Sequence, residues 1–295
     1  MPDEPAAPST TPPTKHGRAG RDLPAAILVG VGLAGALVAS LLWFNWGFVI
    51  IVTASLCLGA LELHQALLKL GMRSAIVPIE LGTVLIVAGS YAAAQQNTVV
   101  GLSSNTVVLV SLGLTALAAL IWRMPQGHVG YVRDAAASLF IIGYLPLLGS
   151  FFSLLLAGDN GPSRVVAFLL CIVANDTGGY AVGVLFGKHP MAPKVSPKKT
   201  WEGFAGSVFL AVAVGISMAI WVLHIAWWVG LVLALSLVGF GTCGDLIESL
   251  IKRDVGIKDM SSFLPGHGGM LDRLDSLLVG APAAWLVLYL FMPGG

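Results

Sequence analysis

Residues 226–251 read AWWVGLVLALSLVGFGTCGDLIESLI, and this stretch indicates how the whole chain folds. Its first 19 residues carry no charge. A membrane-spanning helix needs about 20 predominantly apolar residues. The stretch then ends in the ionisable residues Asp245 and Glu248. We therefore expect a helix that crosses a lipid bilayer and carries polar groups at one end.

The same apolar pattern recurs along the chain, in which 56% of the 295 residues are hydrophobic and 11% are charged. Soluble domains contain about 25% charged residues, so this composition excludes a water-soluble globular protein. Nine stretches qualify as spans, at about residues 23–43, 47–66, 74–94, 99–122, 135–157, 164–187, 203–223, 226–251 and 272–292. The sequence predicts an all-α integral membrane protein, a polytopic bundle of about nine transmembrane helices.

The lysines and arginines predict the orientation of this bundle. Of the 16 Lys and Arg, 15 lie in the N-terminal tail or in alternate gaps between the spans, and only Arg164 lies near the other set of gaps. The basic gaps are residues 67–73, 123–134, 188–202 and 252–271. Since cytoplasmic loops carry an excess of Lys and Arg, we expect a cytoplasmic N-terminus and an outside C-terminus. The expected location is the plasma membrane, with these loops inside.

Three regions follow from this pattern. Residues 1–22, rich in Pro, Ala and Thr, are expected to form a disordered cytoplasmic tail. Residues 23–160 hold the N-terminal transmembrane helices, and residues 161–295 hold most of the polar groups inside spans and are expected to be the catalytic region. The net charge of +1 indicates no nucleic-acid partner.

A polar stripe ends the eighth span. Asp245, Glu248, Ser249 and Lys252 are spaced at i, i+3, i+4 and i+7, so they share one face of a helix. Ionisable groups inside a membrane are costly and are candidates for function. A stripe of interhelical salt bridges is the alternative interpretation.

The loop after this span contains glycines around His267 and leads into the last helix at Asp272. Asp272, Asp275 and Ser276 share one face of that helix. Carboxylates that face Asp245 would suit a hard cation, and Mg²⁺ is usually bound by one or two protein carboxylates together with substrate phosphates. His267 itself is a weak signal, because the turn alone could explain its place.

Two further polar segments precede the stripe. The sixth span contains NDTGGY at residues 175–180, and the loop after it supplies Lys188, Lys194, Lys198 and Lys199. Asn175 and Asp176 could bind a ligand or could form a buried hydrogen-bond network. The lysines could neutralise a triphosphate or could only anchor the loop to anionic lipid. Together, carboxylates, lysines and a glycine-rich turn are typical of phosphoryl or nucleotidyl transfer, and membrane burial indicates a lipid substrate.

The stretch SLIKRDVGIKDMSSFLPGHGGMLDRLDS, residues 249–276, closely resembles the signature of the phosphatidate cytidylyltransferases, also called CDP-diacylglycerol synthases. That signature runs Ser-x-x-Lys-Arg, Lys-Asp, Pro-Gly-His-Gly-Gly and Asp-Arg-x-Asp, and each element is present. The segments around residues 175–180 and 196–203 are also similar to this family. The resemblance covers about residues 165–292.

The resemblance implies that CTP and phosphatidate react to give CDP-diacylglycerol and pyrophosphate, for phospholipid biosynthesis. It also implies Mg²⁺, a second cation such as K⁺, and a homodimer embedded in membrane lipid. The expected residues are Asp245 and Asp272 at the metal; Lys252, Arg253, His267 and Asp275 in catalysis; and Asn175, Asp176, Lys198, Lys199, Ser249, Lys258 and Arg273 at the substrates.

Three other classes of membrane protein remain as alternatives. A transporter would also have many spans with internal polar residues, but here those residues gather at one face. A CDP-alcohol phosphotransferase would carry a DG…AR…G…D…D pattern, which the sequence lacks. A CTP-dependent lipid kinase would bind the same nucleotide but release CDP in place of pyrophosphate.

Overall fold

The computed structural model describes residues 32, 35–95, 101–193, 195–261 and 268–292. Within these residues, eight helices are long and apolar enough to cross a membrane, and they match the second to ninth expected spans. The first expected span lies mostly outside the described residues, although residues 35–43 are helical. The total of nine spans and the disordered tail at residues 1–22 therefore stay predictions.

The helices are α2 (Asn45–Lys69), α3 (Ile76–Gln95), α4 (Ser104–Arg123), α5 (Tyr131–Ile142), α6 (Leu148–Ala157), α7 (Gly161–Phe186), α8 (Trp201–Trp221), α9 (Trp227–Val255) and α10 (Leu271–Phe291). A 3₁₀ turn, η1 (Met124–Gln126), follows α4. Helices α5 and α6 form one span, joined by the π-helical turn η2 (Gly143–Leu147). Pro146 lies inside that turn and cannot donate a backbone hydrogen bond, which accounts for the widened turn.

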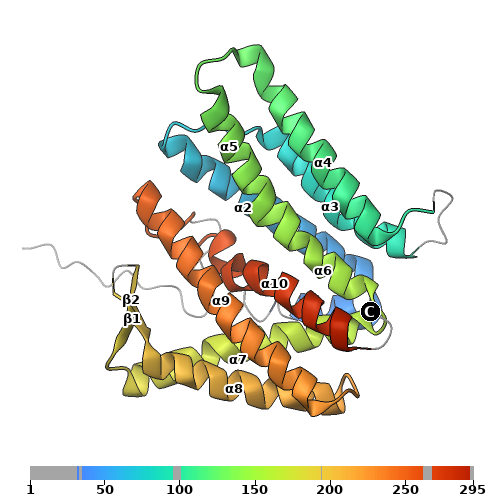
Figure 1. Ribbon diagram of the computed structural model, residues 1–295, viewed down its shortest axis with the longest axis vertical. Coiled ribbons are helices and arrows are strands. Elements are labelled where there is room, and N and C mark those ends of the chain that lie inside the picture. The colour runs from blue at the N-terminus through green and yellow to red at the C-terminus, as the bar shows by residue number, and fades with distance from the viewer. Residues whose placement is uncertain (1–31, 33–34, 96–100, 194, 262–267, 293–295) are drawn as a thin grey trace, which may run out of the picture.

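Figure 1 shows α3, α4 and α5 on one side of the molecule and α7 and α8 on the other, with α9 and α10 between them. Helix α10 contacts α9, α7, α6 and α2, so it joins the two sides. The main core contains buried side chains from α2, α3, α6, α7, α9 and α10, whereas α8 packs through a small separate cluster of Ala211, Ala234 and Val238.

Close packing of α8 depends on glycine. A Cβ atom at Gly178 of α7 would overlap the backbone carbonyl of Gly206 in α8, and a Cβ at Gly215 of α8 would overlap that of Gly230 in α9. Small residues let transmembrane helices approach until their backbones touch. This contact fixes α8 between α7 and α9, and with it the segment that connects α7 to α8.

The sequence analysis predicted that this connecting segment is a loop, but it contains two strands. It forms an antiparallel hairpin of β1 (Pro190–Ala192) and β2 (Ser196–Thr200). Glu202, at the start of α8, accepts hydrogen bonds from the backbone N–H groups of Lys188 at 3.1 Å and His189 at 3.2 Å. The Thr200 hydroxyl accepts from the Gly203 N–H and caps α8. The hairpin is therefore attached to the helix at its base.

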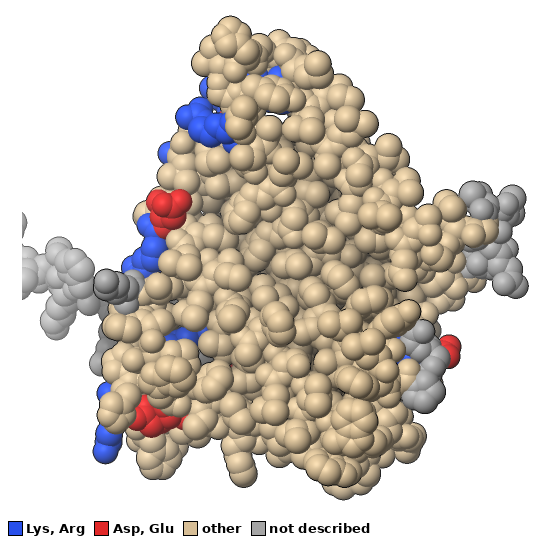
Figure 2. Space-filling view, in the orientation of Figure 1, with Lys and Arg blue, Asp and Glu red and all other residues tan. Residues whose placement is uncertain are grey.

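The described residues of the four basic segments lie at one end of the bundle, while the side of the membrane that this end faces stays a prediction. The Arg73 N–H donates to Asp134 at 2.8 Å, and Arg123 forms an ion pair with the same carboxylate at 2.7 Å. Lys199 on β2 pairs with Asp245 on α9. In Figure 2, the visible Lys and Arg side chains gather toward the left edge, where the hairpin lies in Figure 1.

Candidate active site

A cavity of about 360 Å³ opens at this charged end of the bundle, among α7, α8, α9, α10 and the hairpin. Its lining thus includes groups from segments that are far apart in the sequence. Seven of the predicted site residues line it: Asn175, Asp176, Lys198, Lys199, Asp245, Asp272 and Asp275. The structure therefore brings together the polar segments of the sixth span, the basic loop and the last two helices.

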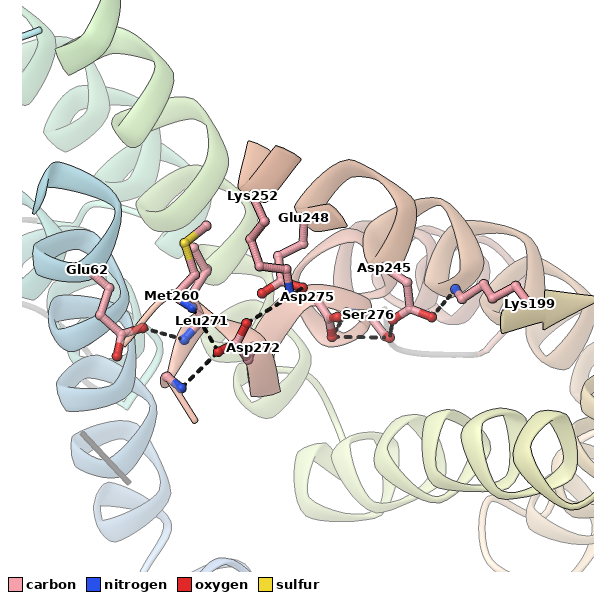
Figure 3. Close-up of polar contacts among 11 residues, drawn as sticks. Glu62, Lys199, Asp245, Glu248, Lys252, Met260, Leu271, Asp272, Asp275 and Ser276 are labelled. Atoms are coloured by element: carbon pink, nitrogen blue, oxygen red, sulfur yellow. Dashed lines mark hydrogen bonds and ion pairs between the residues drawn. The ribbon is translucent and has the colours of Figure 1, made fainter. Parts of the chain in front are cut away.

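Asp245 lies on the open side of this cavity. Lys199 forms an ion pair with one of its carboxylate oxygens, and the Ser276 hydroxyl donates to the other at 2.6 Å. The same hydroxyl lies 3.3 Å from Oδ1 of Asp275, so two carboxylates meet at Ser276 (Figure 3). A Cβ at Gly244 would overlap the Asp275 carbonyl oxygen. A glycine at this point thus allows α9 and α10 to bring the two acids together.

Asp272 is held by the protein on several sides. Its Oδ1 accepts from Lys252 at 2.9 Å, while its Oδ2 accepts from the backbone N–H groups of Gly269 at 2.8 Å and Met260 at 3.1 Å. Lys252 also pairs with Glu248 at 2.7 Å, one helical turn away on α9. The predicted stripe on α9 is real, and Lys252 links it to α10. Lys252 thus holds a carboxylate, as in the salt-bridge interpretation.

Asn175 and Asp176 line the cavity from α7. The Asn175 side chain donates to the Asp176 carboxylate at 2.9 Å, and the Ser207 hydroxyl of α8 donates to the Asn175 backbone carbonyl at 2.6 Å. Asn175 Oδ1 is buried and has no hydrogen-bond partner within the described chain. The pair therefore contributes to a network between helices and still leaves one oxygen for a ligand.

Five predicted residues do not line the cavity. Ser249 is half-buried on α9, and Lys252 is turned toward Glu248 and Asp272. The side chains of the other three are exposed, namely Arg253, Lys258 and Arg273. His267 lies outside the described residues, so its role stays a prediction.

Glu62 is a carboxylate that the sequence analysis missed. It lies in α2 and accepts hydrogen bonds from Ser261 and from Met270 and Leu271 at the start of α10. Its position inside an apolar span was a usable signal, because ionisable residues in such spans are functional candidates. No spacing rule links it to partners about 200 residues away.

The cavity suits a hard cation by the chemistry of its donors. In the described part of the chain, no three Asp, Glu, His or Cys side chains are close enough to hold a metal ion as they stand. Yet Asp245, Asp272, Asp275 and the unpaired Asn175 Oδ1 offer oxygen atoms to a single cavity. Mg²⁺ takes oxygen ligands, and substrate phosphates usually supply some of them. A site in which the protein supplies only part of the ligands is therefore compatible with Mg²⁺.

The chain is similar to known proteins along most of its length. Residues 24–291 match the model of the cytidylyltransferase family. The chain is 38% identical over 290 residues to the phosphatidate cytidylyltransferase of Mycobacterium leprae, which covers 92% of this chain and 89% of that protein. It is 38% identical over 292 residues to that of Mycobacterium bovis, with 95% and 92% covered. A Staphylococcus saprophyticus protein of the same name is 33% identical over 216 residues, 63% of this chain and 83% of that protein. The chain therefore belongs to the cytidylyltransferase family.

Proposed function

We propose that this protein transfers the cytidylyl group of CTP to phosphatidate, giving CDP-diacylglycerol and pyrophosphate for phospholipid biosynthesis. The observation that carries the proposal is similarity along almost the whole chain to proteins named phosphatidate cytidylyltransferase. The cavity adds physical support, because carboxylates and lysines meet there at one end of a lipid-embedded bundle. A lipid headgroup and a water-soluble nucleotide can meet at such a position.

In the proposed reaction, a phosphate oxygen of phosphatidate attacks the α-phosphorus of CTP. The bond from that phosphorus to the oxygen bridging it to the β-phosphate breaks, and pyrophosphate leaves. Lys198 and Lys199 neutralise the triphosphate, since both line the cavity. A phosphate monoester has a second pKa of about 6, so the attacking group needs no protein base near neutral pH.

The carboxylates Asp245, Asp272 and Asp275 are the residues that would hold Mg²⁺. The ion would supply positive charge against the phosphates. Lys252 keeps Asp272 in place, and Ser276 orients Asp245 and Asp275. The resemblance of residues 249–276 supports adding a second cation, such as K⁺, and a homodimer to the proposal. Sedimentation in detergent tests the dimer, and a K⁺ titration of activity tests the cation.

The test of the reaction uses purified protein, CTP labelled at the α-phosphate, and phosphatidate in detergent. We expect label in a lipid product together with release of pyrophosphate. Release of CDP with phosphorylation of the lipid would instead identify a lipid kinase. Absence of any labelled lipid, combined with solute flux in vesicles, would favour a transporter and overturn the proposal.

We also place the protein in the plasma membrane, with the cavity on the cytoplasmic side. The support is the gathering of Lys and Arg at the cavity end of the bundle. Single cysteines in residues 188–202 and 252–271 should resist an impermeant thiol reagent in intact cells. The background needs Cys57, Cys171 and Cys243 replaced. Ready labelling of both segments from outside would reverse the orientation.

A further inference from the structure

Glu62 is a buried carboxylate in α2, outside the segments that resemble the family signature. Only 6% of the residue is exposed. Its Oε1 accepts from the Ser261 hydroxyl at 2.5 Å and the Met270 N–H at 2.8 Å. Its Oε2 accepts from the Leu271 N–H at 2.8 Å (Figure 3). A buried charge of this kind is tolerated when it is fully hydrogen-bonded.

These contacts cap α10 from a distant part of the chain. The first N–H groups of a helix have no partner inside the helix, and the residue at the N-cap position, Met270, makes no side-chain capping bond. Glu62 accepts from two of these N–H groups, and a negative charge at a helix N-terminus is also favoured by the helix dipole. Helix α10 therefore begins where α2 places it.

Glu62 also ties Ser261 to the start of α10. The Ser261 hydroxyl and the Met270 N–H both donate to the same oxygen of Glu62. Neither Ser261 nor the start of α10 can move relative to α2 without breaking at least one of these bonds. One side chain of α2 thus holds two separate segments of the chain.

The residue just before Met270 contacts Asp272. The Gly269 N–H donates to the Asp272 carboxylate, and a Cβ at Gly269 would lie 2.9 Å from Glu62 Oε2 and 3.0 Å from Asp272 Oδ2. Gly269 therefore fills a gap between the two carboxylates that no larger residue would fit. Glu62 does not line the cavity, so any influence on the reaction passes through Asp272.

We infer that Glu62 is a positioning residue of the active site, which sets the place of Asp272 by fixing the start of α10 and the described residues 268–270 just before it. This role rests on the proposed cytidylyl transfer. It differs from a general contribution to stability, because it predicts a selective change in cation dependence and turnover. The helix α2 thereby becomes part of the catalytic apparatus, although it contributes no group to the cavity.

The experiment compares Glu62→Ala and Glu62→Gln with the wild type in detergent. Alanine removes both acceptor oxygens and with them all three hydrogen bonds. Glutamine keeps one oxygen but turns an amide N–H₂ toward a backbone donor. For Glu62→Ala we expect a fall in kcat of about 100-fold, as for a catalytic group displaced by about 1 Å. The Mg²⁺ concentration for half-maximal activity should rise by about tenfold, as for loss of a supporting bond to a metal ligand. Glu62→Gln should give an intermediate effect.

His64→Ala is the matched control. His64 lies two residues further along α2 and bonds to Ser74, so it does not contact the start of α10. The His64→Ala variant should be less stable than the wild type but keep the same Mg²⁺ dependence. If Glu62→Ala does not fold, Glu62→Gln decides. A fall in kcat of about tenfold or more in that variant supports the inference, and a smaller one overturns it.

Hydrogen exchange of the backbone amides of residues 268–272 separates this inference from the proposed function. Faster exchange in the Glu62 variants, but not in His64→Ala, supports the inference that Glu62 positions residues 268–272, whichever reaction the protein catalyses. Unchanged exchange overturns it. A wild-type protein that makes no CDP-diacylglycerol, while exchange still responds to Glu62, would reject the proposed function alone.

Discussion

Asp272 and Asp245 line the same cavity, but the protein holds them very differently. Asp272 is bonded to Lys252 and to two backbone N–H groups, and 11% of its side chain is exposed. Asp245 is bonded to Ser276 and to Lys199 on the hairpin, and 26% of its side chain is exposed. Asp272 is thus fixed in place by the protein. Asp245 is paired with the long side chain of Lys199, which a ligand can displace.

The largest effect is expected from neutralising either carboxylate. Asp245→Asn and Asp272→Asn should each lower turnover by about 1,000-fold, because each removes charge aimed at the bound phosphates and cation. Only Asp272→Asn should also lower the free energy of unfolding, by about 2 kcal/mol, since it breaks a buried charged hydrogen bond. Kinetics at saturating Mg²⁺ and thermal unfolding in detergent measure the two quantities.

Near-normal turnover of either folded variant would remove that residue from the cation site. An equal loss of stability in both variants would mean that the protein does not hold Asp272 more firmly than Asp245.

The second effect concerns Lys252, which compensates two acids. Lys252→Met leaves Glu248, with 3% of its side chain exposed, and Asp272 without their cation. We expect a loss of about 3 kcal/mol in the free energy of unfolding. Adding Glu248→Gln should recover part of that loss, because one buried charge disappears. A single variant as stable as the wild type would mean that Lys252 does not hold Asp272 in place.

The third effect concerns the lysines of the hairpin. Lys199→Gln should lower kcat/KM for CTP by about tenfold to 100-fold, the value of a hydrogen bond to a charged group. Lys198→Gln should have a smaller effect, because Lys198 is exposed and forms no ion pair with an acid among the described residues. Lys199, by contrast, is half-buried against Asp245. The effect should persist in neutral detergent. If the double variant keeps its full kcat/KM in neutral detergent, both lysines only anchor the hairpin to anionic lipid.

The smallest effect is expected at Ser276, whose hydroxyl orients Asp245. Ser276→Ala should lower turnover by about fivefold and the free energy of unfolding by about 1 kcal/mol. Ser153→Ala is the matched control, because Ser153 is also buried and its hydroxyl bonds to Ser90 at 2.7 Å, away from the cavity. It should lose similar stability and keep its activity. Equal activity of the two variants would show that Asp245 needs no help from Ser276.

Much of this site could be predicted from the sequence because its parts follow local rules. Helical spacing placed Asp245, Glu248 and Lys252 on one face, and the structure has them there. Apolar length gave the spans, and the Lys and Arg pattern gave the shared end of the basic segments. Each of these inferences depends on residues within about one span of each other.

The remaining features depend on contacts between distant segments. The ion pair of Lys199 with Asp245 joins residues 46 positions apart, and it depends on a hairpin and on glycine contacts between helices that periodicity does not reveal. The position of Asp272 depends on backbone hydrogen bonds from Met260 and Gly269, which helical spacing does not predict. Glu62 could be recognised as unusual in an apolar span, but its partners could not be named.

The bond between Glu62 and Leu271 spans 209 positions of the chain and has a consequence for biosynthesis. The ribosome releases α2 long before it makes Ser261, Met270 and Leu271, which supply the donors that Glu62 has in the finished protein. Until then this carboxylate must stay hydrated at the membrane surface, because an unpaired charge is costly in hydrocarbon. Helix α2 can therefore settle at its final depth only after the last helix has been inserted.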